Sequence, residues 1–124
     1  MNGRQNLYRL QHWMLAERQR YLADLEALAS RLRTDVENLA GEIDEAGSSN
    51  ASVELKAVYS MAVGPLVERR DKLVRTIAEI EEQIVEARDA VAVSQQEVKI
   101  FEAANAHRGF SFEDRRVRRT RRSA

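Results

Sequence analysis

The chain has 124 residues, of which 32% are charged and only 6% are aromatic, and its 20 Lys and Arg balance its 20 Asp and Glu. One proline and five glycines cannot supply the turns of a many-stranded β sandwich or barrel, so the composition favours long helices. The absence of cysteine excludes disulfides, thiol catalysis and thiolate metal sites, and no apolar stretch approaches the ~20 residues of a membrane helix, which predicts a soluble, intracellular protein.

The balanced charge conceals an uneven distribution along the chain. Residues 113–124 carry six arginines and two acidic residues, whereas residues 1–112 have a net charge of −4. We therefore expect a coiled-coil hairpin over residues 1–112 and a flexible basic tail over residues 113–124. The arginines of this tail are Arg115, Arg116, Arg118, Arg119, Arg121 and Arg122.

A first helix is predicted over residues 5–46, which contain neither proline nor a helix-stopping pair. Its apolar residues recur at intervals of three, four and once seven, which is the spacing of one helical face. They are Leu7, Leu10, Met14, Tyr21, Leu25, Leu28, Leu32, Val36, Leu39 and Ile43. Arg18 falls inside the interval of seven, so this apolar seam is imperfect.

A turn is predicted at about residues 47–50, where Gly47 suits the left-handed position that ends a helix. A second helix follows over about residues 51–108, with a kink or short break at Gly64-Pro65 because proline lacks an amide donor. Its seam positions alternate in steps of four and three, as expected of a coiled coil. They are Leu66, Arg70, Leu73, Ile77, Ile80, Ile84, Ala87, Val91, Ser94, Val98 and Phe101.

Together the two helices predict an all-α fold, a long antiparallel two-helix coiled-coil hairpin. If the chain folds back at residues 47–50, residue i pairs with roughly residue 97 − i. In that register the second helix extends past the first, and four apolar residues between Val93 and His107 lack a partner, namely Val98, Ile100, Phe101 and Ala103. An exposed apolar end is typical of a contact with another chain, so partner binding is expected at the end opposite the turn.

The sequence contains no recognisable catalytic or metal-binding motif. His12 and His107 lack the carboxylate spacing of helical metal motifs, and no phosphate-binding loop or nucleophile elbow is present. The carboxylates are interpreted as a solvated helix face, because a thin two-helix rod offers no pocket that would separate two carboxyl pKa values. We therefore expect no enzymatic activity, no cofactor and no metal.

Two features near the end opposite the turn, which we call the open end, admit several interpretations. Trp13 either covers the seam or anchors an interface. The arginine-rich tail can attract nucleic-acid phosphates, anionic lipid or an acidic protein, or it can act only as a solubilising segment.

Three segments carry a resemblance to a known family. They are Leu7-Tyr8-Arg9-Leu10 followed by Glu17, Arg18, Tyr21 and Leu22; then Arg69-Arg70-Asp71-Lys72-Leu73; and finally Glu97, Lys99, Phe101 and Glu102 before a basic tail. With these segments, the chain resembles over nearly its full length the bacterial flagellar export protein FliJ family, which is related to the type III secretion stalk protein YscO.

The resemblance implies a non-enzymatic stalk or adaptor, an antiparallel hairpin similar to the central stalk of rotary ATPases. Proteins of this family bind the flagellar export ATPase and the cytoplasmic domain of the export gate, and they assist export chaperones and substrates. The implied location is the cytoplasm, peripheral to the inner membrane at the flagellar base. The partner contact is expected at the open end, through Arg9, Trp13, Arg18, Gln95, Lys99, Phe101, Glu102 and Arg108.

Two alternatives stand beside this hypothesis. One is a coiled coil that associates with nucleic acid or a membrane through its Arg-rich tail, although nucleic acid is the less favoured partner because no recognition fold accompanies the tail. The other is a self-associating coiled coil, in which residues 93–101 pair with a second copy. The sequence does not distinguish a flagellar system from a virulence injectisome.

Overall fold

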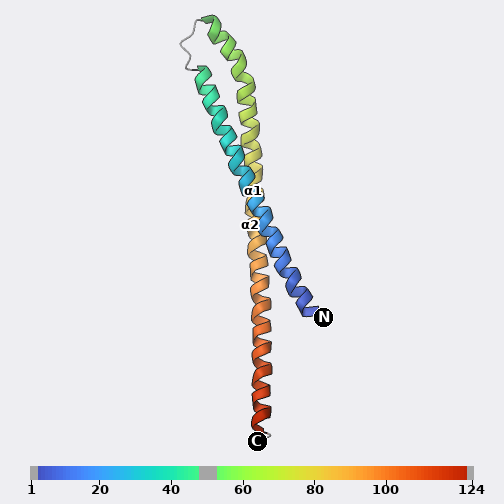
Figure 1. Ribbon diagram of the computed structural model, residues 1–124. Coiled ribbons are helices and arrows are strands. Elements are labelled where there is room, and N and C mark those ends of the chain that lie inside the picture. Colours follow the sequence, from blue (N-terminus) through green and yellow to red (C-terminus); the bar gives the residue numbers. More distant parts are fainter. Residues whose placement is uncertain (1–2, 48–52, 123–124) are drawn as a thin grey trace. The chain divides into compact units, whose positions relative to one another are not determined.

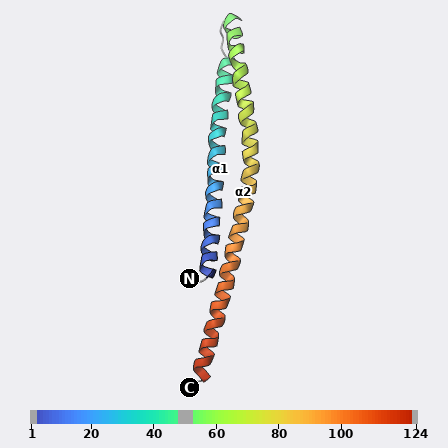
Figure 2. The ribbon, with the colours of Figure 1, turned by 90° about the vertical axis from the view of Figure 1, so that its right-hand side faces the viewer.

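The computed structural model describes the backbone of residues 3–47 and 53–122, and the side chains of residues 3–47 and 56–107. The residues described form two helices and no strand: α1 spans Gly3–Gly47 and α2 spans Val53–Arg122. The helices run in opposite directions and pack against each other (Figures 1 and 2). The predicted all-α antiparallel hairpin is therefore confirmed.

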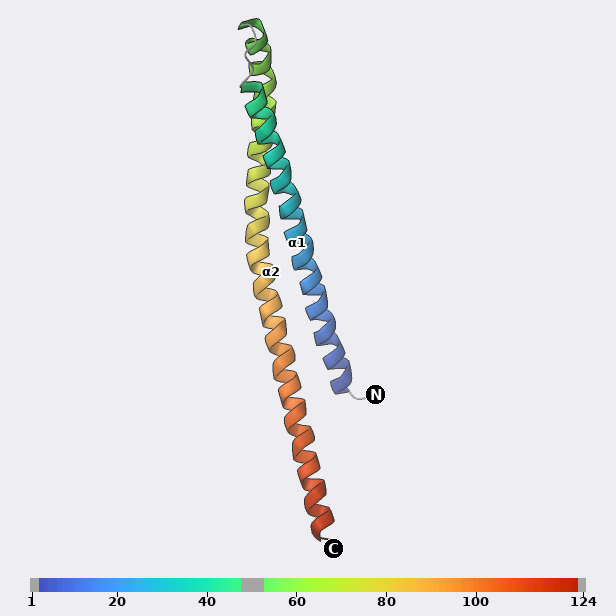
Figure 3. The same ribbon diagram turned by 60° about the vertical axis from the view of Figure 1, so that its left-hand side comes forward.

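The chain divides into two compact units, and each unit contains one segment of each helix. The terminal unit comprises Met1–Arg20 and Arg88–Ala124, and the turn unit comprises Tyr21–Ala87. In Figure 3 the terminal unit is coloured blue and orange to red, and the turn unit lighter blue to yellow. Each unit therefore consists of two antiparallel helix segments with a seam between them.

The charges at the ends of α1 do not stabilise this helix. Its first turn has no acidic residue and its last turn has no basic residue. The last turn instead contains Asp44 and Glu45, whose negative charges oppose the partial negative charge at a helix C-terminus. Packing against α2, rather than terminal charge, therefore stabilises α1.

The core of the turn unit lies on this seam. Leu25 and Ala29 of α1 pack with Ile80, Ile84 and Ala87 of α2. Ala29 has no exposed surface, so a small side chain fills this position between the helices. Burying an isoleucine side chain contributes about 1.5–3 kcal/mol, so the two isoleucines supply a large share of the stability of this unit.

The predicted seam of α2 is confirmed. All eleven predicted positions from Leu66 to Phe101 are buried or half-buried, and the polar Ser94 is the most completely buried of them, with 2% of its surface exposed. The regular alternation of four and three therefore identified the packed face correctly.

The seam of α1 differs from the prediction in its first half. Leu7, Leu10 and Tyr21 are 46%, 49% and 54% exposed, so they do not belong to the seam. An unbroken heptad series of buried and half-buried residues runs along α1 instead, and the predicted residues Met14 and Leu28 are half-buried beside it. The series consists of Gln11, Leu15, Arg18, Leu22, Leu25, Ala29, Leu32, Val36, Leu39 and Ile43. Arg18 thus occupies a seam position and is not an interruption of the seam.

The pairing of the two helices also differs from the prediction. Arg33 Nη2 donates to Glu81 Oε1 at 2.9 Å, and Arg18 donates to Ser94, so the paired residue numbers add up to 114 and 112 rather than 97. In this register the beginning of α1 lies beside the segment expected to be unpaired. Val98 is consequently buried and Phe101 half-buried, whereas Ile100 and Ala103 are exposed.

Proline does not break the second helix. Pro65 lies inside α2, which continues across Gly64 and Pro65, so the expected short break is not observed. Gly64 and Pro65 are both exposed, and water can therefore solvate the carbonyl that loses its amide partner. Figure 1 shows α2 curving over its first turns, before it continues along α1.

The ends of the predicted second helix also change. Gly47 is the last residue of α1 and does not have a positive φ, so it is not the left-handed terminator that the sequence predicted. The rest of the predicted turn lies outside the described residues. At the other end, α2 continues to Arg122 instead of stopping near residue 108, so the segment predicted as a flexible tail is helical.

Neither of the described helices is both long and apolar enough to cross a lipid bilayer.

Candidate partner-binding site

The terminal unit contains all the residues predicted to contact a partner. Arg9, Trp13 and Arg18 lie on α1, and Gln95, Lys99, Phe101 and Glu102 lie on α2. Arg108 and the six arginines of residues 115–122 also belong to α2, but their side chains lie outside the described residues. The contacts of the described residues separate the side chains that hold the two helices together from those that face solvent.

Four side chains form an aromatic cluster that joins the helices near the beginning of α1. The Tyr8 hydroxyl donates to Glu102 Oε1 at 3.2 Å, and His12 Nε2 lies 3.6 Å from the same oxygen. The Tyr8 ring centroid lies 4.3 Å from that of His12 and 5.6 Å from that of Phe101. Phe101 and Glu102, predicted as partner contacts, are thus engaged within the hairpin, and the sequence analysis missed Tyr8 and His12 as their neighbours.

The aromatic cluster changes the acidity of Tyr8. Desolvation by the surrounding protein, the hydrogen bond to Glu102 and the negative charge of that carboxylate together raise the pKa of Tyr8 above its ordinary value of 10.0. The hydroxyl therefore keeps its proton, and its role as the donor to Glu102, to a higher pH than an unperturbed tyrosine would.

A second polar contact lies within the seam itself. Arg18 Nη1 donates to Ser94 Oγ. Gln11 occupies the seam position that precedes Leu15, and its Oε1 atom is buried without a hydrogen-bond partner among the described residues. Polar seam groups contribute less stability than apolar ones, but they favour a single register when they meet each other. Arg18, predicted as a partner contact, therefore helps to align the two helices and is half-buried.

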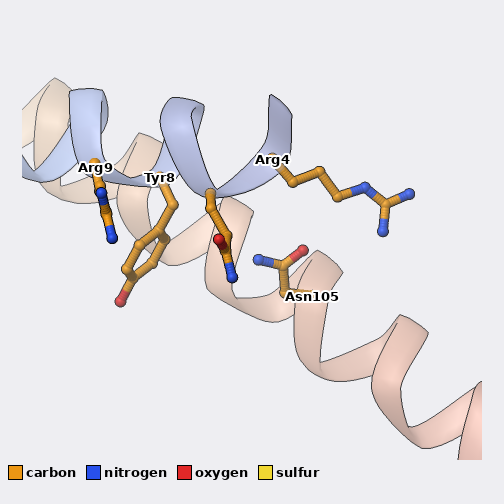
Figure 4. A pocket seen from close by; sticks show the side chains of 5 residues that line it. Arg4, Tyr8, Arg9 and Asn105 are labelled. Carbon is orange, nitrogen blue, oxygen red and sulfur yellow. The ribbon is translucent and has the colours of Figure 1, made fainter. Parts of the chain in front are cut away.

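Arg9 faces solvent at the end of the hairpin. Together with Arg4, Gln5, Tyr8 and Asn105 it lines an open depression of about 460 Å³. Figure 4 shows Arg4, Tyr8 and Arg9 projecting from α1 while Asn105 reaches from α2 toward them. All five residues are exposed, so the depression is a shallow polar surface and not an enclosed pocket for a small molecule.

Trp13 is the largest exposed side chain of this unit. It is 61% exposed, which excludes the interpretation that it covers the seam. Gln95 and Lys99 are also exposed, as are the apolar residues Val93 and Ile100, which are 53% and 61% exposed. The surface of the terminal unit thus combines large apolar side chains with separate cations, a combination suited to contact with another macromolecule.

Within the described part of the chain, histidine, aspartate and glutamate side chains nowhere gather in groups of three or more that could hold a metal ion. His12 has Glu102 as its charged neighbour; the His12 side chain is 43% exposed, but its Nε2 atom is buried.

Comparison of the chain with protein-family models, with curated proteins and with solved structures finds no match.

Proposed function

We propose that the chain is a non-enzymatic stalk or adaptor of the bacterial flagellar type III export apparatus. It binds the export ATPase and the cytoplasmic domain of the export gate through its terminal unit, and it assists export chaperones and substrates at the cytoplasmic face of the inner membrane. The observation that carries this proposal is the antiparallel hairpin whose terminal unit exposes Trp13, together with Leu10 and Ile100.

The contacts described above change which residues act as anchors. Phe101 contacts Tyr8 and Arg18 donates to Ser94, and both side chains are half-buried, so they present less surface to a partner than the exposed residues do. Trp13 remains as an apolar anchor, and Arg9 and Lys99 remain as exposed cations. Tryptophan and arginine are enriched among the residues that dominate binding energy, which makes Trp13 and Arg9 the strongest candidates.

The hairpin acts by favouring particular states of its partner. An asymmetric stalk contacts the subunits of a ring unequally, so its binding energy stabilises some subunit conformations over others. By linkage, a stalk that changes the ATPase conformation changes nucleotide affinity by the same coupling free energy. No catalytic group of the stalk is needed for this effect.

The proposal is tested by titrating the purified chain into flagellar export ATPase in ~0.15 M salt, which screens weak charge attraction. Saturable binding with altered ATP turnover is expected. Trp13→Ala should weaken binding at least tenfold, because a buried anchor contributes roughly 2 kcal/mol or more. Met61→Ala, a matched truncation at an 81% exposed residue of the turn unit, should leave the affinity unchanged. Absence of binding, or a larger loss with Met61→Ala than with Trp13→Ala, would reject the proposal.

The continuation of α2 to Arg122 favours a second candidate function. A helix rich in arginine presents cations at regular spacing to phosphate groups, whether those of nucleic acid or of an anionic membrane. Under this alternative, binding to DNA or to anionic vesicles falls steeply with salt and disappears when the chain is truncated after Phe112. The two probes are used separately, so that each source of phosphate gives its own result.

A further inference from the structure

The two flanks of the seam in the terminal unit differ in chemistry. Each side of the seam of an antiparallel coiled coil is lined by flanking residues from both helices, which lie beside one another. On one side of the terminal unit these residues are polar: His12 lies beside Glu102, with Nε2 and Oε1 3.6 Å apart, and Gln19 and Gln95 continue the same flank. We call this side the polar edge.

The opposite flank is apolar. Leu7, Leu10 and Met14 follow each other on α1 at intervals of three and four, so they form a stripe beside the seam residues. On α2 the corresponding flank holds Ala90, Val93 and Ile100. We call these six residues the apolar edge. Leu7, Leu10, Val93 and Ile100 are between 46% and 61% exposed, whereas Met14 and Ala90 are half-buried, so four of the six residues present most of the accessible apolar surface of this edge.

Two acidic residues complete the heptad spacing of the apolar edge. Glu17 is the next position after Met14 on α1, and Glu97 lies between Val93 and Ile100 on α2. Glu17 lies 3.3 Å from Arg20, but this pair is exposed, with 70% of the arginine and 44% of the glutamate side chain accessible. An exposed pair of this kind is worth at most about 1 kcal/mol, so Glu17 can exchange Arg20 for a cation of a partner.

We propose that the apolar edge is the docking surface for an amphipathic α-helix of a partner protein, and that this helix carries basic residues beside its apolar stripe. Two parallel stripes at heptad spacing fit the side chains of a third helix, which would complete a three-helix coiled coil. The two glutamates select a helix with lysine or arginine at the flanking positions, by charge complementarity.

The same charges disfavour a second copy of this chain as the occupant. A twofold interface brings the same surface of both copies together. It would place Glu17 and Glu97 of one copy against an edge whose own charges are the same two glutamates, and like charges at an interface cost affinity. The proposal rests on the helix faces alone and is independent of the flagellar assignment.

The test uses two synthetic helical peptides with leucine at their seam positions, one flanked by lysine and one flanked by glutamate. Binding of each labelled peptide to the full chain is measured by fluorescence anisotropy at ~0.15 M salt, where long-range attraction is screened. The lysine peptide should bind saturably and at least tenfold more tightly than the glutamate peptide. Replacing both Glu17 and Glu97 by lysine should reverse this preference.

A matched control makes the same charge change away from the apolar edge. Glu82→Lys with Asp89→Lys alters two exposed residues on the outer face of α2, and the preference for the lysine peptide should persist. Ile100→Glu should remove binding while the helix content measured by circular dichroism stays unchanged, because Ile100 is 61% exposed. The proposal is overturned if neither peptide binds, if both bind equally, or if the chain alone is a dimer that Ile100→Glu converts to a monomer.

Discussion

Replacing Arg33 and Glu81 by cysteine provides a direct test of how the two helices are aligned. The chain has no cysteine of its own, so these two would be its only thiols. Both native side chains are 53% exposed and join at 2.9 Å, which means that their replacement removes only a surface ion pair. A short bis-maleimide should therefore connect the two cysteines within one molecule.

The competing alignment predicts a different pair. If paired residue numbers added up to 97, Arg33 would face Gly64, which is 17 residues from Glu81 and therefore about 26 Å away along α2. Cysteine fits at Gly64, because a Cβ there meets no other atom within 4 Å. Arg33→Cys with Gly64→Cys is thus a matched control that differs only in the position of the second thiol.

The cross-link also has a thermodynamic signature. It closes a loop between residues separated by 48 positions, which removes denatured-state entropy worth up to about 4 kcal/mol at 25 °C. The melting temperature of the cross-linked Arg33/Glu81 variant should rise by roughly 10 °C or more relative to the same variant without the linker. Efficient intramolecular cross-linking of the Arg33/Gly64 variant, with little for the Arg33/Glu81 variant, would refute the alignment described here.

Three further predictions concern individual side chains. Ile84→Ala should lower the free energy of unfolding by about 2–3 kcal/mol in urea titrations because Ile84 is 6% exposed, while truncating the neighbouring Val85, 57% exposed, should change it by less than about 0.5 kcal/mol. Because folding raises the pKa of Tyr8, the neutral hydroxyl stabilises the folded chain fully below the pKa of Tyr8 in the unfolded chain, and this stabilisation is lost as pH rises through the pKa in the folded chain. Above about pH 10, the melting temperature of the wild type should therefore fall more steeply than that of Tyr8→Phe. Ser94→Val removes the hydrogen-bond acceptor of Arg18 and should lower the free energy of unfolding by about 1–3 kcal/mol. Adding Arg18→Leu to Ser94→Val should restore the wild-type stability or exceed it. If the double variant instead lost the sum of the two single losses, this reasoning would be contradicted.

The packed face of α2 was predictable because its apolar positions follow one heptad series with few exceptions. The first half of α1 was not, because two apolar stripes lie side by side there. Leu7, Leu10 and Met14 follow helical spacing as well as Leu15 and Leu22 do, and only the position of α2 decides which stripe is buried. Apolar periodicity alone therefore assigned the exposed stripe to the seam.

The predicted alignment of the two helices was wrong for a related reason. A heptad pattern repeats every seven residues, so sliding one helix by about two heptads again places apolar residues opposite apolar residues. The polar seam residues break this degeneracy, because Arg18 meets Ser94 in the observed alignment. Matching these two polar positions, which the sequence already displays, would have identified the register and placed Phe101 beside Tyr8.

The family resemblance could name candidate residues but could not tell which of them the hairpin itself uses. Arg18, Phe101 and Glu102 make intramolecular contacts, while Arg9, Trp13, Gln95 and Lys99 remain on the surface. Whether a side chain at a given heptad position makes an intramolecular contact depends on which residues of the other helix lie opposite it. The pattern of a single helix does not contain this alignment.

The separation between contacting residues grows steadily from the turn unit to the terminal unit, and this gradient sets an order of assembly. Contacts join residues 48 positions apart at Arg33–Glu81, 76 apart at Arg18–Ser94 and 94 apart at Tyr8–Glu102. Each doubling of a loop adds about 0.6 kcal/mol to the entropic cost of closing it, so we expect the hairpin to form from the turn outward and to open first near the chain termini. Backbone amides of the terminal unit should therefore exchange with deuterium before those around Leu25 and Ile84. A partner that binds the terminal unit would slow that exchange, because its binding would stabilise the part of the hairpin that opens first.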